Sequence, residues 1–208
     1  SAVKYILSNS ADITPLALQK LLYYTQSFYK VFYGEYLFNE DCEAWVHGPV
    51  YREIYFKYKG FGYDPIEDDH LLFTDIQLNE SEKEVIDSII VNFGCYSGKI
   101  LEKMTHEERP WRFTRRGLKP NESSDRIIKK ELLPKYFNQI KSKYDMLNVS
   151  DIKKKEQKIT HSQKNHESSK KINIRQEMKI LSWLVLLFIG IYFLGFLIAV
   201  MSVFYRWV

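Results

Sequence analysis

The 208 residues allow one ordinary globular domain plus an accessory segment, and an apolar content of 45% is enough for a core, which excludes a disordered chain. The net charge of +4 is unevenly spread: residues 1–150 hold 20 Lys and Arg against 22 Asp and Glu, whereas residues 151–179 hold 9 against 4. Phosphate recognition usually places a basic patch on a folded surface, so the slightly acidic front part argues against a nucleic-acid partner.

The first clear element is an amphipathic helix within residues 12–35. Thr14 is a good N-cap, and Pro15 suits the first helical position, where its missing N–H is not needed. Gly34 supplies the stop signal. Apolar residues recur between them at helical spacing: Leu18, Leu21, Leu22, Thr25, Phe28, Tyr29 and Phe32. This pattern predicts a helix with one face in a core.

The same helix carries side chains that an apolar stripe does not explain. Gln19 and Lys20 lie at the edge of the stripe, and an amide and an amine need hydrogen-bond partners if they are buried. The alternative is that both reach solvent along their aliphatic stems. Because tyrosine is common at interfaces, we expect Tyr23, Tyr24 and Tyr29 to contribute to an interaction surface.

The next segment contains a turn. Residues 36–46, which end in Trp45 and Val46, predict a hairpin or a single small strand pair. His47 is interpreted as a turn residue that donates to backbone, with a catalytic role as the alternative. Gly48 lets the backbone turn and Pro49 suits a first helical position, so a second helix is expected from here to Gly60.

Two helices are expected after a loop over residues 61–78. Ser81 and Glu84 have the spacing of a capping box for a helix that ends at Gly94. A shorter helix is expected over residues 97–104.

The last part of the domain contains two further helical signals. In residues 105–111, Thr105 and Glu108 have the spacing of a second capping box, and Pro110 limits any helix to one turn. Residues 123–144 predict a long final helix that Pro134 would kink. The predicted fold class is therefore mainly α with a minor β-hairpin.

The sequence contains few signals for chemistry. Nucleotide-binding, zinc-protease and hydrolase-elbow motifs are missing, so no cofactor or metal is expected. Cys42 and Cys95 are interpreted as reduced thiols, with a disulfide between them as the alternative. His106 and Glu107 form the one pair suited to a hydrolytic enzyme, but consecutive residues do not face one site, and a helix-capping role is favoured. We expect a binding module rather than an enzyme.

The chain after the domain is basic and then wholly apolar. Residues 149–179 predict a flexible or partly helical tether whose lysines can lie on anionic lipid headgroups. Its His161 and His166 lack further ligands at metal-binding spacing. Residues 180–204 contain no charge and are long enough to cross a hydrocarbon core of about 30 Å, which predicts a transmembrane helix, with a buried core helix as the alternative.

The charges beside this segment predict its orientation. Lys170, Lys171, Arg175 and Lys179 precede the apolar segment, and Arg206 alone follows it. The predicted arrangement is a cytoplasmic domain over residues 1–148, a single span in the cytoplasmic membrane and a short external tail over residues 205–208.

Three motifs together resemble a known family. The stretches "ITPLALQKLLYYTQ" (13–26), "AWVHGPV" (44–50) and "THEERPW" (105–111) occur in the order and with the spacing of the Panacea domain. That family includes SocA-like antitoxins and proteolytic adaptors of bacterial and phage toxin–antitoxin systems. The resemblance covers roughly residues 1–144.

The resemblance implies a non-enzymatic helical domain that binds and neutralises a protein toxin. Its motif positions, which would be framework or partner-surface residues, are Gln19, Lys20, Tyr24, Trp45, Gly48, Pro49, His106 and Trp111. The tether and apolar segment depart from the family pattern, because many members end soon after the domain. We favour a membrane anchor for residues 180–204; the alternative is a membrane-acting effector fused to its own antitoxin.

Overall fold

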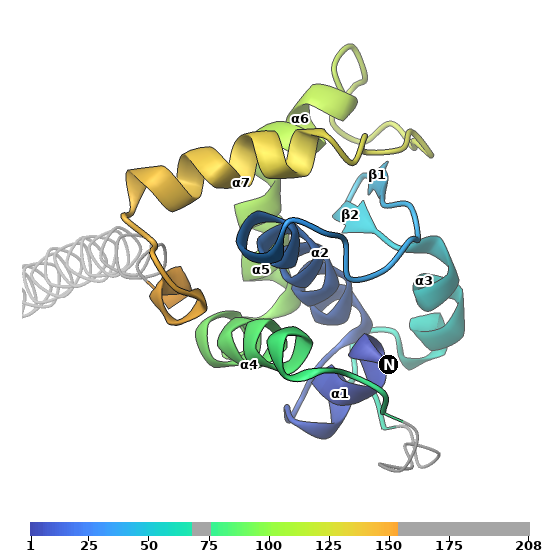
Figure 1. Ribbon diagram of the computed structural model, residues 1–208. Coiled ribbons are helices and arrows are strands. Elements are labelled where there is room, and N and C mark those ends of the chain that lie inside the picture. The colour runs from blue at the N-terminus through green and yellow to red at the C-terminus, as the bar shows by residue number, and fades with distance from the viewer. Residues whose placement is uncertain (68–75, 154–208) are drawn as a thin grey trace, which may run out of the picture. The chain divides into compact units, whose positions relative to one another are not determined.

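The computed structural model describes residues 1–67 and 76–153, and these residues form a mainly helical fold (Figure 1). The predicted fold class is confirmed for them: they comprise seven α-helices and one two-stranded sheet. The helices are α1 (Ala2–Ser8), α2 (Pro15–Tyr33), α3 (Arg52–Tyr58), α4 (Glu80–Phe93), α5 (Gly98–His106), α6 (Arg109–Thr114) and α7 (Leu132–Lys143). The strands are β1 (Glu43–Trp45) and β2 (Gly48–Val50), and the 3-10 helices are η1 (Lys59–Phe61) and η3 (Val149–Lys153).

Helix α2 forms the centre of the fold. Its limits are as predicted, because the Thr14 side chain accepts a hydrogen bond from Ala17 N at 3.3 Å and Gly34 ends the helix with a φ of 79°. It lies between α4 and α7 in Figure 1, and it also contacts α5, α1, α3 and β2. Every residue from position 17 to 29 is buried, so this helix has no solvent-facing side over that length.

Aromatic rings fill the space between α2, α4 and α7. Tyr24 stacks on Phe93 with ring centroids 4.5 Å apart, and Phe28 meets Phe137 edge-on at 5.1 Å. Tyr23 also meets Phe137 edge-on, at 5.8 Å. Such aromatic pairs contribute about 0.5–1.5 kcal/mol beyond the area that they bury.

The expected hairpin forms, but its second strand includes the residues that predicted a helix start. Ala44 pairs with Pro49, and Trp45 pairs with Gly48. Proline is tolerated here because the N–H of Ala44 points away from β2 and donates to Arg126 O at 2.8 Å, so this pair needs no donor from Pro49. Helix α3 therefore begins only at Arg52.

The helix predicted over residues 123–144 is wrong in its first part. Residues 126–128 run beside β1 instead, because Ile128 N donates to Cys42 O at 2.7 Å and Ala44 N donates to Arg126 O. Helix α7 begins at Leu132, which places Pro134 in its first turn, where a missing N–H breaks no helical bond. The predicted kink is therefore absent from this helix.

Two other helix starts differ from expectation. The capping box of α4 is formed by Asn79 and Glu82, two residues before the predicted pair. Pro110 lies in the first turn of α6 and begins a helix that continues to Thr114, rather than ending one. The sequence patterns also did not indicate α1 or η3.

The predicted tether lies mostly outside the described residues, and the predicted transmembrane helix over residues 180–204 lies wholly outside them. Within the described part of the chain, no helix combines the length and apolar character that crossing a bilayer requires. Helix η3 packs on α4, where Ser88 Oγ donates to Val149 O at 3.0 Å and Ile152 is buried. The packed unit therefore continues past the domain boundary expected at residue 148.

Candidate partner-binding site

The buried Lys20 of α2 is hydrogen bonded to the second strand of the hairpin. Lys20 is fully buried, and its Nζ donates to Pro49 O at 2.9 Å. Burial lowers the pKa of Lys20 to about 7, and a neutral amine still donates this hydrogen bond. Gly48 lies directly above with a φ of 99°, and a Cβ there would come within 2.8 Å of both Lys20 Cε and Thr105 Oγ1. The glycine is required by conformation and by space.

Two glutamine side chains of α2 form hydrogen bonds with backbone groups of the segments that precede and follow the hairpin. Gln19 Oε1 accepts from Tyr51 N at 2.7 Å, and Gln19 Nε2 donates to Tyr51 O at 3.4 Å. Gln26 Oε1 accepts from Leu37 N at 2.9 Å, and its Nε2 donates to Phe38 O. Gln19 thus satisfies backbone groups of the buried Tyr51, and Gln26 does the same for the half-buried Leu37 and Phe38. Of the alternatives for Gln19 and Lys20, burial with partners is the one observed.

The third motif holds the hairpin from the other side. Trp111 Nε1 donates to Trp45 O at 2.9 Å, and the His106 ring stacks on Trp111 with centroids 4.0 Å apart. Burial lowers the pKa of His106 below its usual value, which favours the neutral ring. His106 is also hydrogen bonded to the backbone of Val46, while Glu107 is exposed. These contacts support the hairpin, and none of them pairs His106 with Glu107.

The turn residue His47 lies at the exposed end of the hairpin. Its side chain is 64% exposed, and Nδ1 lies 2.9 Å from Glu102 Oε1. Lys99 Nζ lies 2.9 Å from the other oxygen of Glu102. Burial alone would raise the pKa of Glu102, but the hydrogen bonds from His47 and Lys99 lower it below its ordinary value. His47 therefore contacts a side chain rather than the backbone partner expected from the sequence.

The tyrosines expected on an interaction surface are in the core. Tyr23 and Tyr24 are 0% exposed and Tyr29 is 3% exposed, so the prediction that they face outward is wrong. Tyr24 OH donates to Glu108 Oε1 at 3.2 Å. Because Glu108 is itself buried and Thr105 lies within α5, the capping box expected from these two residues does not form.

Sequence reasoning missed a buried arginine that completes the framework. Arg115 donates through Nη1 to Ala44 O at 2.9 Å and through Nη2 to Glu122 O at 2.6 Å. It therefore connects β1 to the loop that follows α6. No local pattern distinguishes Arg115 from its neighbour Arg116, which is exposed.

Beside the hairpin lies an open hollow of about 840 Å³, which we call the hairpin groove. Its lining residues come from the hairpin, the start of α3 and the loop before α7: Trp45, Val46, His47, Arg52, Asn121, Ser123, Ser124 and Asp125. Of the predicted motif residues, Trp45 and His47 line this groove, Gln19 and Lys20 are buried beneath the hairpin, and Gly48 and Pro49 are buried within its second strand. Cys42 and Cys95 are not joined by a disulfide, as expected.

The three sequence motifs meet at the hairpin, and a comparison with known families identifies the domain that contains them. The profile of the family described as "Antitoxin SocA-like, Panacea domain" matches residues 18–112. A Panacea domain lies at these residues. The resemblance of the three motifs is thus confirmed over this range, which includes α2 from its second turn, the hairpin and the stacked His106–Trp111 pair. No curated protein and no solved structure matches the chain. The Panacea domain supports a role related to toxin–antitoxin systems, and it supports a non-enzymatic one.

Proposed function

We propose that the Panacea domain is an antitoxin that neutralises a protein toxin by binding it at the hairpin groove. The observation that carries the proposal is the antitoxin-family match over residues 18–112. The geometry adds a surface: Lys20 and Trp111 hold the hairpin by hydrogen bonds to its backbone, and Gln19 holds the backbone of Tyr51, the residue that follows the hairpin. A backbone held in this way lets Trp45 and His47 meet a partner with little loss of conformational entropy on binding.

The composition of the groove suits a protein partner. Trp45 and Arg52 are of the residue types that most often dominate binding energy at interfaces. Asn121 and Asp125 supply polar groups for the rim.

The same proposal places the domain at the inner face of the cytoplasmic membrane. Support for this comes from the residue pattern alone: an uncharged segment over residues 180–204 with basic residues before it. An anchor there would keep the antitoxin near a toxin that acts on the membrane. The basic residues 153–179 would add contacts with anionic headgroups.

Growth of a bacterial host tests the proposal. The full chain, residues 1–156 and residues 157–208 would each be expressed alone and together with the product of the adjacent gene, with a membrane-potential dye as second readout. We expect the adjacent product to arrest growth and the full chain to relieve the arrest. Arrest and depolarisation by residues 157–208 alone, relieved by residues 1–156, would instead identify the apolar segment as the toxic element.

Two variants test the surface. His47→Ala and Arg52→Ala should abolish or weaken the relief of arrest while leaving the helical content unchanged, because both side chains are exposed. Arg112→Ala, which removes an exposed arginine from α6, is the matched control. Relief that is equal for all three variants would place the toxin-binding surface elsewhere.

A further inference from the structure

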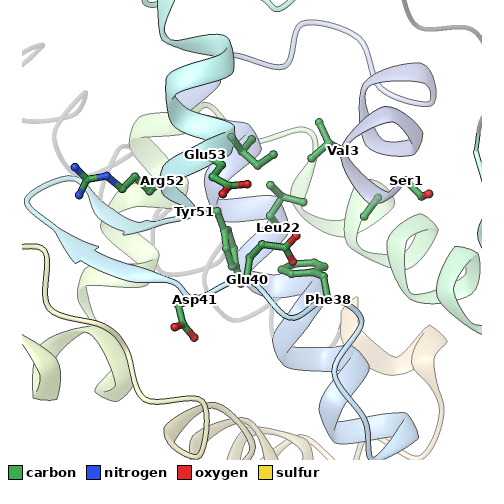
Figure 2. Close-up of a pocket in the computed structure, with 11 residues that line it drawn as sticks. Ser1, Val3, Leu22, Phe38, Glu40, Asp41, Tyr51, Arg52 and Glu53 are labelled. Atoms are coloured by element: carbon green, nitrogen blue, oxygen red, sulfur yellow. The ribbon is translucent and has the colours of Figure 1, made fainter.

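A second hollow, of about 370 Å³, lies between α1, α2, α3 and residues 38–41 (Figure 2). We call it the acidic pocket. Leu22 and Tyr51, both buried, form its apolar floor, and Phe38 and Ile54 add to its walls. Its volume is at the lower end of the range of about 300–1,000 Å³ that is usual for ligand pockets.

Two carboxylates face this apolar floor. Glu53 comes from α3 and Glu40 from the segment before β1, and Figure 2 shows both carboxylates directed toward the hollow. Within the described residues, neither carboxylate forms an ion pair or a side-chain hydrogen bond.

The other charged residues of the pocket have partners elsewhere. Asp41 lies 3.6 Å from Lys130 Nζ, and Arg52 Nη1 lies 3.6 Å from Glu43 Oε2. Both side chains point away from the hollow in Figure 2. The side-chain charge that faces the pocket is therefore negative, and among the described residues no lysine or arginine side chain pairs with Glu40 or Glu53.

An apolar floor beneath two carboxylates matches a particular kind of side chain. Lysine and arginine combine an aliphatic stem, which covers apolar surface, with a cationic head. Such a residue would place its stem against Leu22 and Tyr51 and its charge between Glu40 and Glu53. An acidic or neutral polar side chain would leave the carboxylates without a counter-charge.

The position of the pocket points to a protein as the source of this side chain. Arg52 lines both the acidic pocket and the hairpin groove, so the two hollows adjoin the same residue of α3. One polypeptide lying across the start of α3 can reach both.

We propose that the acidic pocket receives an arginine or lysine side chain, next to an apolar residue, from the protein partner of the Panacea domain. This inference rests on the antitoxin function proposed above and adds the chemical class of the segment that is recognised. The carboxylates would select a cationic residue, and the apolar floor would select its hydrophobic neighbour.

Peptide binding to the full chain tests the pocket without the partner. The probe is the capped peptide Ala-Leu-Arg-Leu-Ala, and the matched peptide replaces arginine by citrulline, which is neutral and of nearly the same shape. Isothermal titration calorimetry should show at least tenfold weaker binding of the citrulline peptide. The double variant Glu40→Gln with Glu53→Gln should bind the arginine peptide at least tenfold more weakly, whereas Glu67→Gln, an exposed carboxylate away from the pocket, should bind it like the original chain. Equal binding of both peptides, or no loss in the double variant, would overturn the proposal.

The growth assay separates this inference from the proposed function. If the double variant relieves the arrest caused by the adjacent gene product less well than Glu67→Gln does, the pocket takes part in partner recognition. If both relieve it fully, the inference is overturned and the antitoxin function stands. If the original chain relieves no arrest, the proposed function fails, and with it the claim that the pocket serves a toxin.

Discussion

The buried amine of Lys20 makes the stability of the domain depend on pH. The informative change is Lys20→Met, which keeps an unbranched apolar side chain of similar length and removes the titrating group. Lys20 is fully buried, and its described hydrogen-bond acceptor is Pro49 O. Burial lowers its pKa to about 7 in the folded chain, whereas a lysine in an unfolded chain has a pKa of about 10.4.

The sign and size of the effect follow from this difference. Between pH 7 and 10.4 the unfolded chain keeps a proton that the folded chain has lost, so the free energy of unfolding rises with pH in this window. At about 1.4 kcal/mol per pKa unit, Lys20 lowers the stability by about 4 kcal/mol at pH 7 and by about 2 kcal/mol at pH 9. Below pH 7 both states are protonated and the cost is at its maximum.

The pH dependence of the free energy of unfolding can be measured by urea denaturation of residues 1–156 at pH 7, 8 and 9, with far-ultraviolet circular dichroism as the readout. The free energy of unfolding of the original segment should rise by about 2 kcal/mol relative to Lys20→Met between pH 7 and 9, since all other titrating groups are common to both. The methionine variant also loses the hydrogen bond to Pro49, but that loss of about 1 kcal/mol does not depend on pH. Lys103→Met, which removes an exposed lysine of α5, is the control for the loss of one positive charge.

A difference that stays constant across this range would refute the reasoning. It would mean that the amine keeps its proton on folding, so that water or a carboxylate reaches it. The position of Lys20 beneath the hairpin would then have to be more open than the structure shows.

Three further substitutions test the framework and the surface by urea denaturation and by partner binding. Gly48→Ala should destabilise the domain by more than about 2 kcal/mol, because its φ is 99° and a Cβ would lie 2.8 Å from two buried side-chain atoms. The control is Gly117→Ala, which should cost only about 1 kcal/mol because Gly117 has a φ of 85° but open space around it. Equal costs for the two variants would contradict the close packing at Gly48. Tyr24→Phe should cost about 1–3 kcal/mol by removing a buried hydrogen bond to Glu108, and an unchanged midpoint would show that this bond contributes nothing. His47→Ala should change the stability by less than about 1 kcal/mol, because the side chain is exposed and loses only its surface contact with Glu102. It should also weaken toxin binding, and undiminished binding would remove the hairpin end from the site.

Capping and stop residues in the sequence correctly predicted the helix ends that depend only on residues within one turn. The Thr14 cap and the Gly34 stop define α2 because both act within one helical turn. Ser97 caps α5 in the same way, with its side chain accepting from Ile100 N. The three motifs also indicated the family, and that part of the prediction is confirmed over residues 18–112.

Long-range hydrogen bonds decided what these signals left open. Pro49 has the same local signature at a helix start as on an edge strand, and its strand conformation depends on β1 and on Lys20, 29 positions earlier. Residues 126–128 have helical spacing, yet they are extended because β1 and the residue before it offer Ala44 N and Cys42 O as partners.

The site followed the same division between local pattern and tertiary contact. The sequence by itself determined that Gln19, Lys20, Trp45, Gly48, Pro49, His106 and Trp111 belong together as motif residues, and that Lys20 needs a partner if it is buried. Only the tertiary structure decided which of them are buried supports and which are exposed. Periodicity describes one helix against one surface, whereas α2 is surrounded by five helices and a strand, so its burial depends on elements that approach it from every side.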